Sequence, residues 1–143
     1  SNKIDVGSFS VSAGVSYTGT SSFNESLVND LSWYLQANGS VSYHYKPFGL
    51  TTSVYYKYNG KVPVYVLDSN GNSLKQNNED YQLLDATVSK KLWKDRIEIG
   101  GGLKNIFNVT DVRRFATGEI HSGGSSSSLL PGRLFFLKLS VNI

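Results

Sequence analysis

The sequence predicts an all-β protein: an antiparallel up-and-down sheet of the kind that forms the wall of a transmembrane β-barrel. Six segments alternate between apolar and polar residues with a period of two, the period of side chains along a β-strand. The connections between these segments alternate between long and short. Tyr, Phe and Trp make up 13% of the residues, and 14 glycines stand against 3 prolines, a balance typical of strands joined by open loops.

The first three segments alternate most regularly. In residues 8–18 and 31–45 the odd positions are mainly apolar, and in residues 48–59 the even positions are. The opposite positions hold Ser, Thr, Gly, Asn, Gln and Tyr, with Lys57 almost the only charge. Such groups suit the wet interior of a membrane barrel, because the outer face of a soluble barrel usually carries Lys, Glu and Asp.

The last three segments are residues 81–92, 97–107 and 134–143. Lys90 interrupts the apolar positions of the first, next to a short turn where its ammonium group can reach the lipid headgroups. The six predicted strands have about ten to fifteen residues, against ~5–6 in soluble sheets and ~9–11 for a tilted crossing of a bilayer. Aromatic residues crowd the predicted strand ends, as in the two interfacial girdles of membrane barrels.

Two connections are tight, at Lys46-Pro47 and at residues 93–96, and three are long and polar, at residues 19–30, 60–80 and 109–133. Short turns on one side and long loops on the other are the layout of an outer-membrane barrel. Six strands are fewer than the ~8 of the smallest such barrels, and an open sheet would leave two unpaired edges in lipid. We therefore expect part of a larger barrel. A barrel shared by several short chains and a soluble lipocalin-like ligand-binding barrel are the alternatives.

Several other classes of protein are not expected. Cysteine is absent, which excludes a disulfide framework and a thiolate metal site. The net charge of +3 comes from scattered Lys and Arg, so no nucleic-acid partner is predicted. No set of nucleophile, base and acid is visible, and we predict neither an enzyme nor a cofactor.

Two stretches resemble the C-terminal end of the TonB-dependent outer-membrane receptors. Residues 103–108, Leu-Lys-Asn-Ile-Phe-Asn, match the motif that closes the penultimate strand of that family. After a long loop, Gly132 and Arg133 followed by aromatic residues match the entry into the last strand. That strand ends flush with the chain on an apolar residue, where the family typically has an aromatic one. The motif residues, to which we assign a structural role, are Asn105, Phe107, Asn108, Gly132, Arg133 and Ile143.

The resemblance implies that residues 1–143 are the last six strands of a ~22-stranded barrel in the outer membrane of a Gram-negative bacterium. The plug domain and the earlier strands would be absent. It also implies active import of a scarce nutrient, such as an iron chelate, haem, a corrinoid or an oligomeric nutrient, with energy supplied by TonB through the absent N-terminal part. Expected partners are outer-membrane lipid, the remaining barrel and plug, TonB and the nutrient. A passive porin-like channel is the alternative function, and an adhesin-like role of the loops is the third.

Candidate ligand-binding residues lie in the last long loop. Arg113, Arg114 and Phe115 combine two guanidinium groups with an aromatic ring, which suits an anionic or carboxylate-bearing ligand. His121 offers an imidazole of the kind that ligates haem iron. A surface loop with solvated charges would have the same composition.

Three tyrosines on the predicted polar face are further candidates. Tyr34, Tyr55 and Tyr81 would line a substrate path or hydrogen-bond to the plug. No metal site is predicted with them.

The middle long loop resembles a calcium loop only in part. Asp68, Asn70, Asn72 and Glu79 occupy positions one, three, five and twelve of such a loop, but Gly71 falls at the fourth position instead of the sixth. An Asn-Gly hairpin tip explains the same residues more simply.

Overall fold

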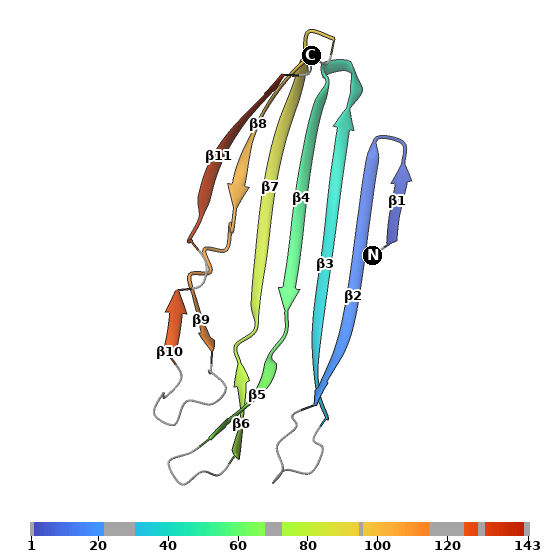
Figure 1. Ribbon diagram of the computed structural model, residues 1–143. Coiled ribbons are helices and arrows are strands. Elements are labelled where there is room, and N and C mark those ends of the chain that lie inside the picture. The colour runs from blue at the N-terminus through green and yellow to red at the C-terminus, as the bar shows by residue number, and fades with distance from the viewer. Residues whose placement is uncertain are drawn as a thin grey trace.

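The computed structural model describes residues 2–21, 31–67, 73–94, 96–114, 125–128 and 131–141. They form one seven-stranded antiparallel sheet and two two-stranded ribbons, which confirms the predicted all-β antiparallel fold (Figure 1). In order, the sheet contains β1 (Asn2–Val6), β2 (Phe9–Ser21), β3 (Leu31–Tyr45), β4 (Leu50–Asn59), β7 (Tyr81–Leu92), β8 (Ile97–Lys104) and β11 (Leu134–Val141). The ribbons pair β5 (Val62–Leu67) with β6 (Ser73–Asn78), and β9 (Asp111–Arg114) with β10 (Ser125–Ser128). Within these ranges no helix is both long and apolar enough to cross a membrane.

The pairing of the strands collects the apolar positions on one face of the sheet. Residues directly opposite each other in an antiparallel pair point to the same face. One such row crosses all seven strands and is apolar throughout: Ile4, Val11, Val41, Val54, Ala86, Leu103 and Phe135. We call this side the apolar face and the opposite side, with Ser12, Ser40 and Tyr55 in neighbouring rows, the polar face.

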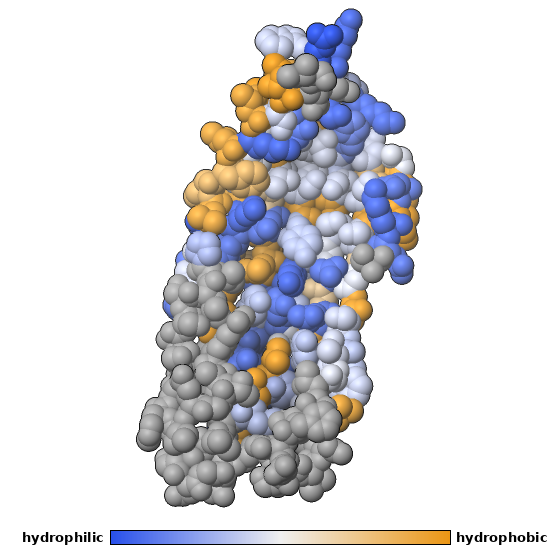
Figure 2. All heavy atoms as spheres, in the orientation of Figure 1, coloured by the Kyte–Doolittle hydropathy of each residue, from blue (hydrophilic) through white to orange (hydrophobic). Residues whose placement is uncertain are grey.

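The apolar face is exposed over the whole described sheet. Val15 is 74% exposed, Phe135 77% and Leu137 93%, and Val112 is the one buried hydrophobic residue in the part of the chain that the structure describes. The predicted strands are therefore not packed around a core of their own. Hydrophobic residues also gather along the edge formed by β8 and β11, whereas hydrophilic residues cover the middle of the sheet in the same view (Figure 2).

Short and long connections lie at opposite ends of the sheet, as the sequence predicts (Figure 1). The short-turn end holds the ends of β1, β3 and β7, and the loop end holds the ends of β2, β4 and β8 and both ribbons. Gly7 and Gly49 have φ of 61° and 58°, the left-handed region that glycine enters at no steric cost.

The structure differs from the predicted elements in four places. β1 was not predicted, because its five residues include Asn2, Lys3 and Asp5 and show little apolar alternation. Residues 60–80 and 109–133 were predicted as loops, but they contain the β5–β6 and β9–β10 ribbons. The fourth difference is the length of β8, which ends at Lys104 instead of residue 107 because Asn105 turns the backbone to a φ of 52°. The sheet is open, with β1 and β11 at its two edges.

The strands are evenly staggered across the sheet. Opposite Phe9, the first residue after the first short turn, lies Tyr43, and β3 continues two residues further to Tyr45 before the second turn. Lys90 lies opposite Leu50, and β7 likewise continues two residues further, to Leu92, before the third turn. From one short turn to the next, the sheet advances by two strands and shifts by two residues, so neighbouring strands are shifted by about one residue. With ~3.3 Å per residue and ~4.8 Å between strands, this shift corresponds to a strand tilt of about 35°.

Candidate functional site

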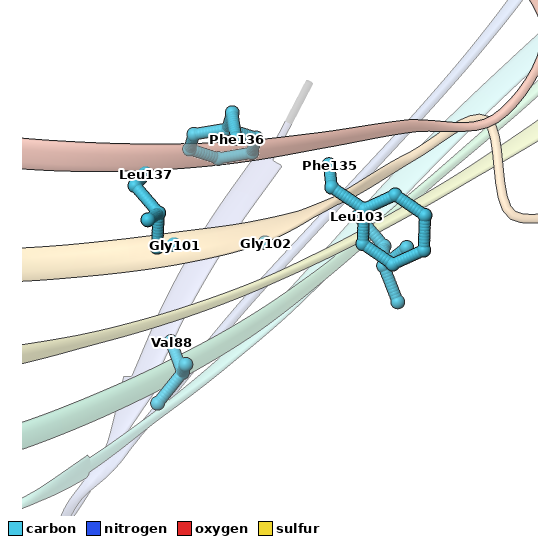
Figure 3. Close-up of a pocket in the computed structure, with 7 residues that line it drawn as sticks. All are labelled: Val88, Gly101, Gly102, Leu103, Phe135, Phe136 and Leu137. Carbon is cyan, nitrogen blue, oxygen red and sulfur yellow. The ribbon is translucent and has the colours of Figure 1, made fainter.

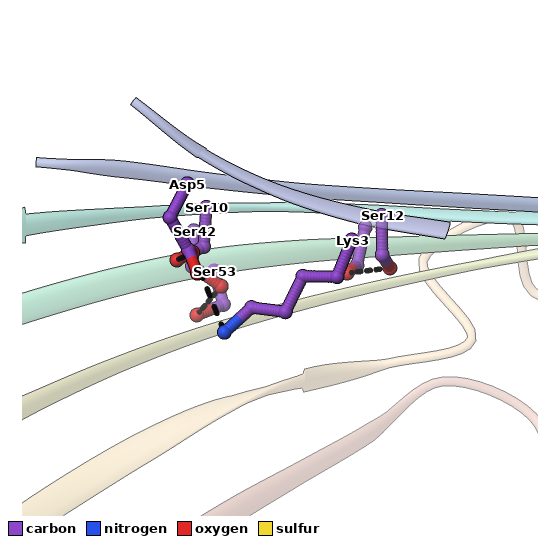
Figure 4. Close-up of polar contacts among 7 residues, drawn as sticks. Lys3, Asp5, Ser10, Ser12, Ser42 and Ser53 are labelled. Atoms are coloured by element: carbon purple, nitrogen blue, oxygen red, sulfur yellow. Dashed lines mark hydrogen bonds and ion pairs between the residues drawn. The ribbon is translucent and has the colours of Figure 1, made fainter. Parts of the chain in front are cut away.

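The polar face is held together by pairs of hydroxyl groups on neighbouring strands. The Oγ atoms of Ser12 and Ser40 lie 2.8 Å apart, and those of Ser42 and Ser53 also lie 2.8 Å apart (Figure 4). Each hydroxyl can both donate and accept, so the pairs satisfy each other across the strands. The result is a surface of small hydroxyl side chains over β2, β3 and β4.

Charged side chains of the sheet lie almost entirely on the polar face. Asp5 accepts a hydrogen bond from Ser10 and pairs with Lys3 at 3.3 Å (Figure 4). At the other edge, Lys138 Nζ lies 3.8 Å from Glu98 Oε1. The one charged residue that the pairing places on the apolar face of the described strands is Lys90, two residues before the end of β7. The prediction that Lys90 lies on the apolar side beside a short turn is confirmed.

Aromatic rings mark both ends of the apolar face. At the short-turn end Phe9 and Tyr43 have ring centroids 4.7 Å apart, and Tyr45 stacks on Phe48 at 5.5 Å. At the loop end the rings of Tyr17 and Trp33 stack at 5.0 Å. We call these two groups the aromatic belts. Phe9 and Tyr17 are eight residues apart on β2, so the belts lie about 26 Å apart along the strand and about 22 Å apart after a tilt of about 35°.

An open apolar groove runs between β7 and β11 over the glycines of β8. It has a volume of about 720 Å³ and is lined by Val88, Gly101, Gly102, Leu103, Phe135, Phe136 and Leu137 (Figure 3). Leu137 lies over Gly101, where an added Cβ would come within 3.1 Å of its Cδ2 atom. Gly101 faces the same side of the sheet as Leu103 and Leu137, so its missing side chain opens the groove on the apolar face, whereas Gly102 faces the polar side.

A clasp at the loop end joins β8, β11 and the base of the last long connection. Its centre is Asn105, 7% exposed. The side chain donates from Nδ2 to the carbonyl oxygens of Val109 (2.8 Å) and Pro131 (3.2 Å), and its Oδ1 accepts from the Val109 backbone N–H (2.9 Å). The Asn105 backbone N–H donates to Asp85 Oδ1 on β7 (2.8 Å). One buried amide thus ties both ends of a long connection to the sheet.

The second half of the clasp involves Asn108 and the Gly132-Arg133 pair. Asn108 Oδ1 accepts from the Arg133 backbone N–H (2.9 Å), and the Arg133 guanidinium donates to the Ile106 carbonyl from Nε (3.2 Å) and Nη2 (2.8 Å). A Cβ on Gly132 would lie 2.9 Å from Asn108 Oδ1, so no larger residue fits without a shift. Both asparagines have φ near 55°, a conformation that Asn adopts more readily than most other residues.

These contacts place four of the predicted motif residues in one structural unit. Asn105, Asn108, Gly132 and Arg133 belong to the clasp, whereas Phe107 is 51% exposed beside it. Ile143 lies outside the described residues. The spacing of the motif thus has a physical basis in the hydrogen bonds of the rim.

The predicted loop residues are described only in part. Arg113 and Arg114 lie in β9, opposite Ser126 and Ser125, but their side chains are not among those described. Phe115 and His121 lie outside the described residues, so the ligand and haem hypotheses on this loop remain predictions.

The middle long loop, which resembles a calcium loop only in part, is likewise only partly described. Asp68, Asn70 and Asn72 lie outside the described ranges. In the part of the chain that is described, no group of three or more His, Asp or Glu residues is placed to hold a metal ion.

Two of the three candidate tyrosines come together. Tyr34 and Tyr81 line a pocket on the polar face at the loop end, together with Gln36 and Asn59. Tyr55 lies on the same face but opposite Ser40 and Asp85, away from this pocket. Gln36 and Asn59 were not among the residues predicted for a site. Their pairing follows from the short turn at residues 46–49, because β3 and β4 keep one register from that turn to Gln36 and Asn59.

No protein-family model, no curated protein and no solved structure matches the chain.

Proposed function

We propose that this chain is a wall segment of a transmembrane β-barrel in the outer membrane of a Gram-negative bacterium, within a TonB-dependent transporter that imports a scarce nutrient. The observation that carries the proposal is the continuous, exposed apolar face of a single sheet whose other face is lined by hydroxyl groups. In lipid, a spanning sheet needs such an apolar outer face and keeps its polar residues toward a wet interior.

The dimensions of the apolar face support a membrane location. The aromatic belts are separated by about 22 Å, close to the ~25 Å apolar band between the aromatic girdles of membrane barrels. The charge of Lys90 lies near the belt at the short-turn end, where a long side chain reaches the headgroups.

The stagger of the strands supports membership in a barrel. A tilt of about 35° lies at the lower end of the range that closed membrane barrels have. The edges at β1 and β11 would pair with the remaining strands, because an unpaired backbone edge is not viable in hydrocarbon. A soluble lipocalin-like barrel would instead expose the polar face of β2, β3 and β4 to water. Lys57 is the one charged residue on that part of the polar face, whereas the outer face of a soluble barrel usually carries Lys, Glu and Asp.

The assignment to a transporter rests on the resemblance of the terminal motif, for which the clasp supplies a physical reason. The clasp anchors a long connection firmly at the rim, and long surface loops are where such transporters contact their ligands. The same clasp would also anchor a long loop in a passive porin-like channel, which is the alternative function.

The membrane orientation can be tested with single cysteines, since the chain has none of its own. In the complete barrel reconstituted in vesicles, a fluorophore attached at Val15→Cys or Leu139→Cys should be quenched by brominated lipid. The neighbouring positions, Ser16→Cys and Ser140→Cys, should respond to a water-soluble quencher instead. The opposite pattern, or no lipid quenching at any position, would exclude the proposed orientation.

Active transport is separated from passive diffusion by its energy requirement. In cells that depend on the complete protein for uptake, a protonophore should abolish uptake by the transporter. Uptake that continues at the same rate with the protonophore would support the porin-like channel.

A further inference from the structure

We propose that a group of basic residues at the short-turn end of the sheet binds the anionic headgroups of phospholipids in the periplasmic leaflet of the outer membrane. The group consists of Lys46, Lys90, Lys94 and Arg96, and we call it the basic cluster. This inference deepens the proposed function and rests on it, because the short turns of outer-membrane barrels lie on the periplasmic side.

The fold brings the basic cluster together from two distant parts of the sequence. Lys46 begins the turn after β3, a short 3-10 helix η1 (Lys46–Phe48), whereas the other members belong to β7 and to the turn after it. The two turns lie side by side (Figure 1). They are in direct contact, because the Lys91 backbone N–H donates to the Gly49 carbonyl at 2.9 Å. Cations that are more than forty residues apart in the sequence therefore share one end of the sheet.

Charge is distributed unevenly between the turns and the long connections. The basic cluster has four cations, and with Asp95 between its last two members its charge is +3. Lys91 is not counted, because it lies on the polar face opposite Glu98. The three long connections, which join strands at the loop end, hold five Lys and Arg residues and seven Asp and Glu residues, a charge of −2. The short-turn end is therefore the end that attracts anions.

The place of Lys90 on the apolar face indicates a ligand at the membrane surface. Lys90 lies in one row with Tyr45 and Ile99 and is exposed. A lysine on a lipid-facing surface lays its methylene groups along the hydrocarbon and extends its ammonium group to the headgroup layer. The anionic groups at that depth are the phosphates of the lipids. A lipid headgroup therefore reaches Lys90 more readily than an anion in solution does.

Exposed aromatic rings lie in the same two turns as the basic cluster. Phe48 is 61% exposed and Trp93 76%. Trp93 also lines a hollow of about 450 Å³ together with Lys94 and Arg96. Aromatic side chains of this kind are enriched where a protein crosses from hydrocarbon to water. A phospholipid joins an anionic group to apolar chains, so it matches cations beside apolar rings, whereas a free phosphate would gain nothing from the rings.

The test compares the lipid next to the basic cluster with the lipid far from it. The complete barrel is reconstituted in vesicles of phosphatidylcholine and phosphatidylglycerol, and an equal fraction of one or the other lipid carries bromine on its acyl chains. An uncharged fluorophore at Leu139→Cys reports on lipid near the cluster, because Leu139 lies in the row of Lys90, two strands away. A fluorophore at Val15→Cys, six residues along β2 from Phe9 at the short-turn end, reports on distant lipid. We expect brominated phosphatidylglycerol to quench more strongly at Leu139→Cys and both lipids to quench equally at Val15→Cys.

Neutralising single cations tests whether the basic cluster causes the preference. One cation near an anionic membrane surface favours binding by about fivefold, so we expect a preference for phosphatidylglycerol of at least about fivefold at Leu139→Cys. Lys90→Gln and Lys94→Gln should each lower this preference by about two- to fivefold. The matched control is Lys57→Gln, which removes the same charge from the polar face of β4 and should leave the preference unchanged.

Four outcomes would overturn the inference. Both lipids quench equally at Leu139→Cys, neither cluster variant lowers the preference, Lys57→Gln lowers it as much as they do, or glycerol phosphate in solution removes it. The last result would assign the basic cluster to a soluble anion. In each case the barrel assignment stands as long as brominated lipid quenches at Val15→Cys. If neither lipid quenches at either position, the membrane assignment falls, and the lipid-binding inference falls with it.

Discussion

Asn105 and Asn108 join the end of β8 to both sides of the last long connection. Asn105 and Asn108 both adopt positive φ, and their side chains bind the backbone on both sides of a long connection. A side-chain amide is suited to this task because it offers donors and an acceptor at once. The motif in the sequence predicted that both residues lie at the rim. Which carbonyls and N–H groups they bind could not be predicted, since their partners lie up to 26 residues away.

Removing the Asn105 side chain should loosen the clasp. Asn105→Ala loses three side-chain hydrogen bonds and places a Cβ-bearing residue without a polar group at a φ of 52°, which we expect to cost about 2–4 kcal/mol of unfolding free energy. Asn105→Gly loses the same bonds but adopts this φ freely, so it should be less destabilising by about 1 kcal/mol. Urea titration of the complete barrel in micelles measures both values. Wild-type stability in both variants would show that the clasp does not anchor the rim.

The short turns determine how neighbouring strands of the sheet pair. A short turn fixes the register of its hairpin, so the turn at residues 46–49 sets every pair from Tyr45 and Leu50 to Gln36 and Asn59. The β5–β6 ribbon keeps the register of β4 and β7 beyond Gly60, and is thus a continuation of the same hairpin. β6, β9 and β10 were not predicted because their residues, such as Ser73 and Asn77, show no apolar alternation. β5 was not predicted because it is a short apolar run that contains Pro63.

A charge in the middle of the apolar face should be costly if that face meets lipid. Val54 lies in the row that is apolar across all seven strands, so Val54→Arg should destabilise the barrel in vesicles by about 2–4 kcal/mol. Lys90→Arg, which keeps the charge near the belt at the short-turn end, should change the stability by less than about 1 kcal/mol. Reversible unfolding in urea, followed by tryptophan fluorescence, measures both. A tolerated arginine at position 54 would argue for an apolar face that does not meet hydrocarbon.

At the scale of the whole molecule, the sheet has two faces and two open edges. An exposed apolar surface of this extent is unusual for a soluble monomer and marks a region that meets a partner or a membrane. The edges at β1 and β11 add unpaired backbone groups, which in water promote pairing with other chains.

Residues 1–143 produced alone should therefore not be a monomer in buffer. We expect aggregation in water and dispersal in detergent, because the apolar face has no cover and both edges lack a neighbouring strand. Size-exclusion chromatography with light scattering, with and without detergent, checks this. A stable, folded monomer in detergent-free buffer would favour the soluble lipocalin-like barrel.

The sequence by itself determined the six long strands of the sheet, the division of each into an apolar and a polar side, and the ends at which turns and loops lie. These features are local, because side-chain alternation and turn residues act within a few positions of each other. Only the tertiary structure decided that the apolar sides of seven strands join into one exposed face, and that Tyr34 and Asn59 meet Tyr81 in one pocket. Both depend on the register between strands that long connections separate. Alternation within a strand excludes a shift by one residue, but it does not choose among shifts by two residues.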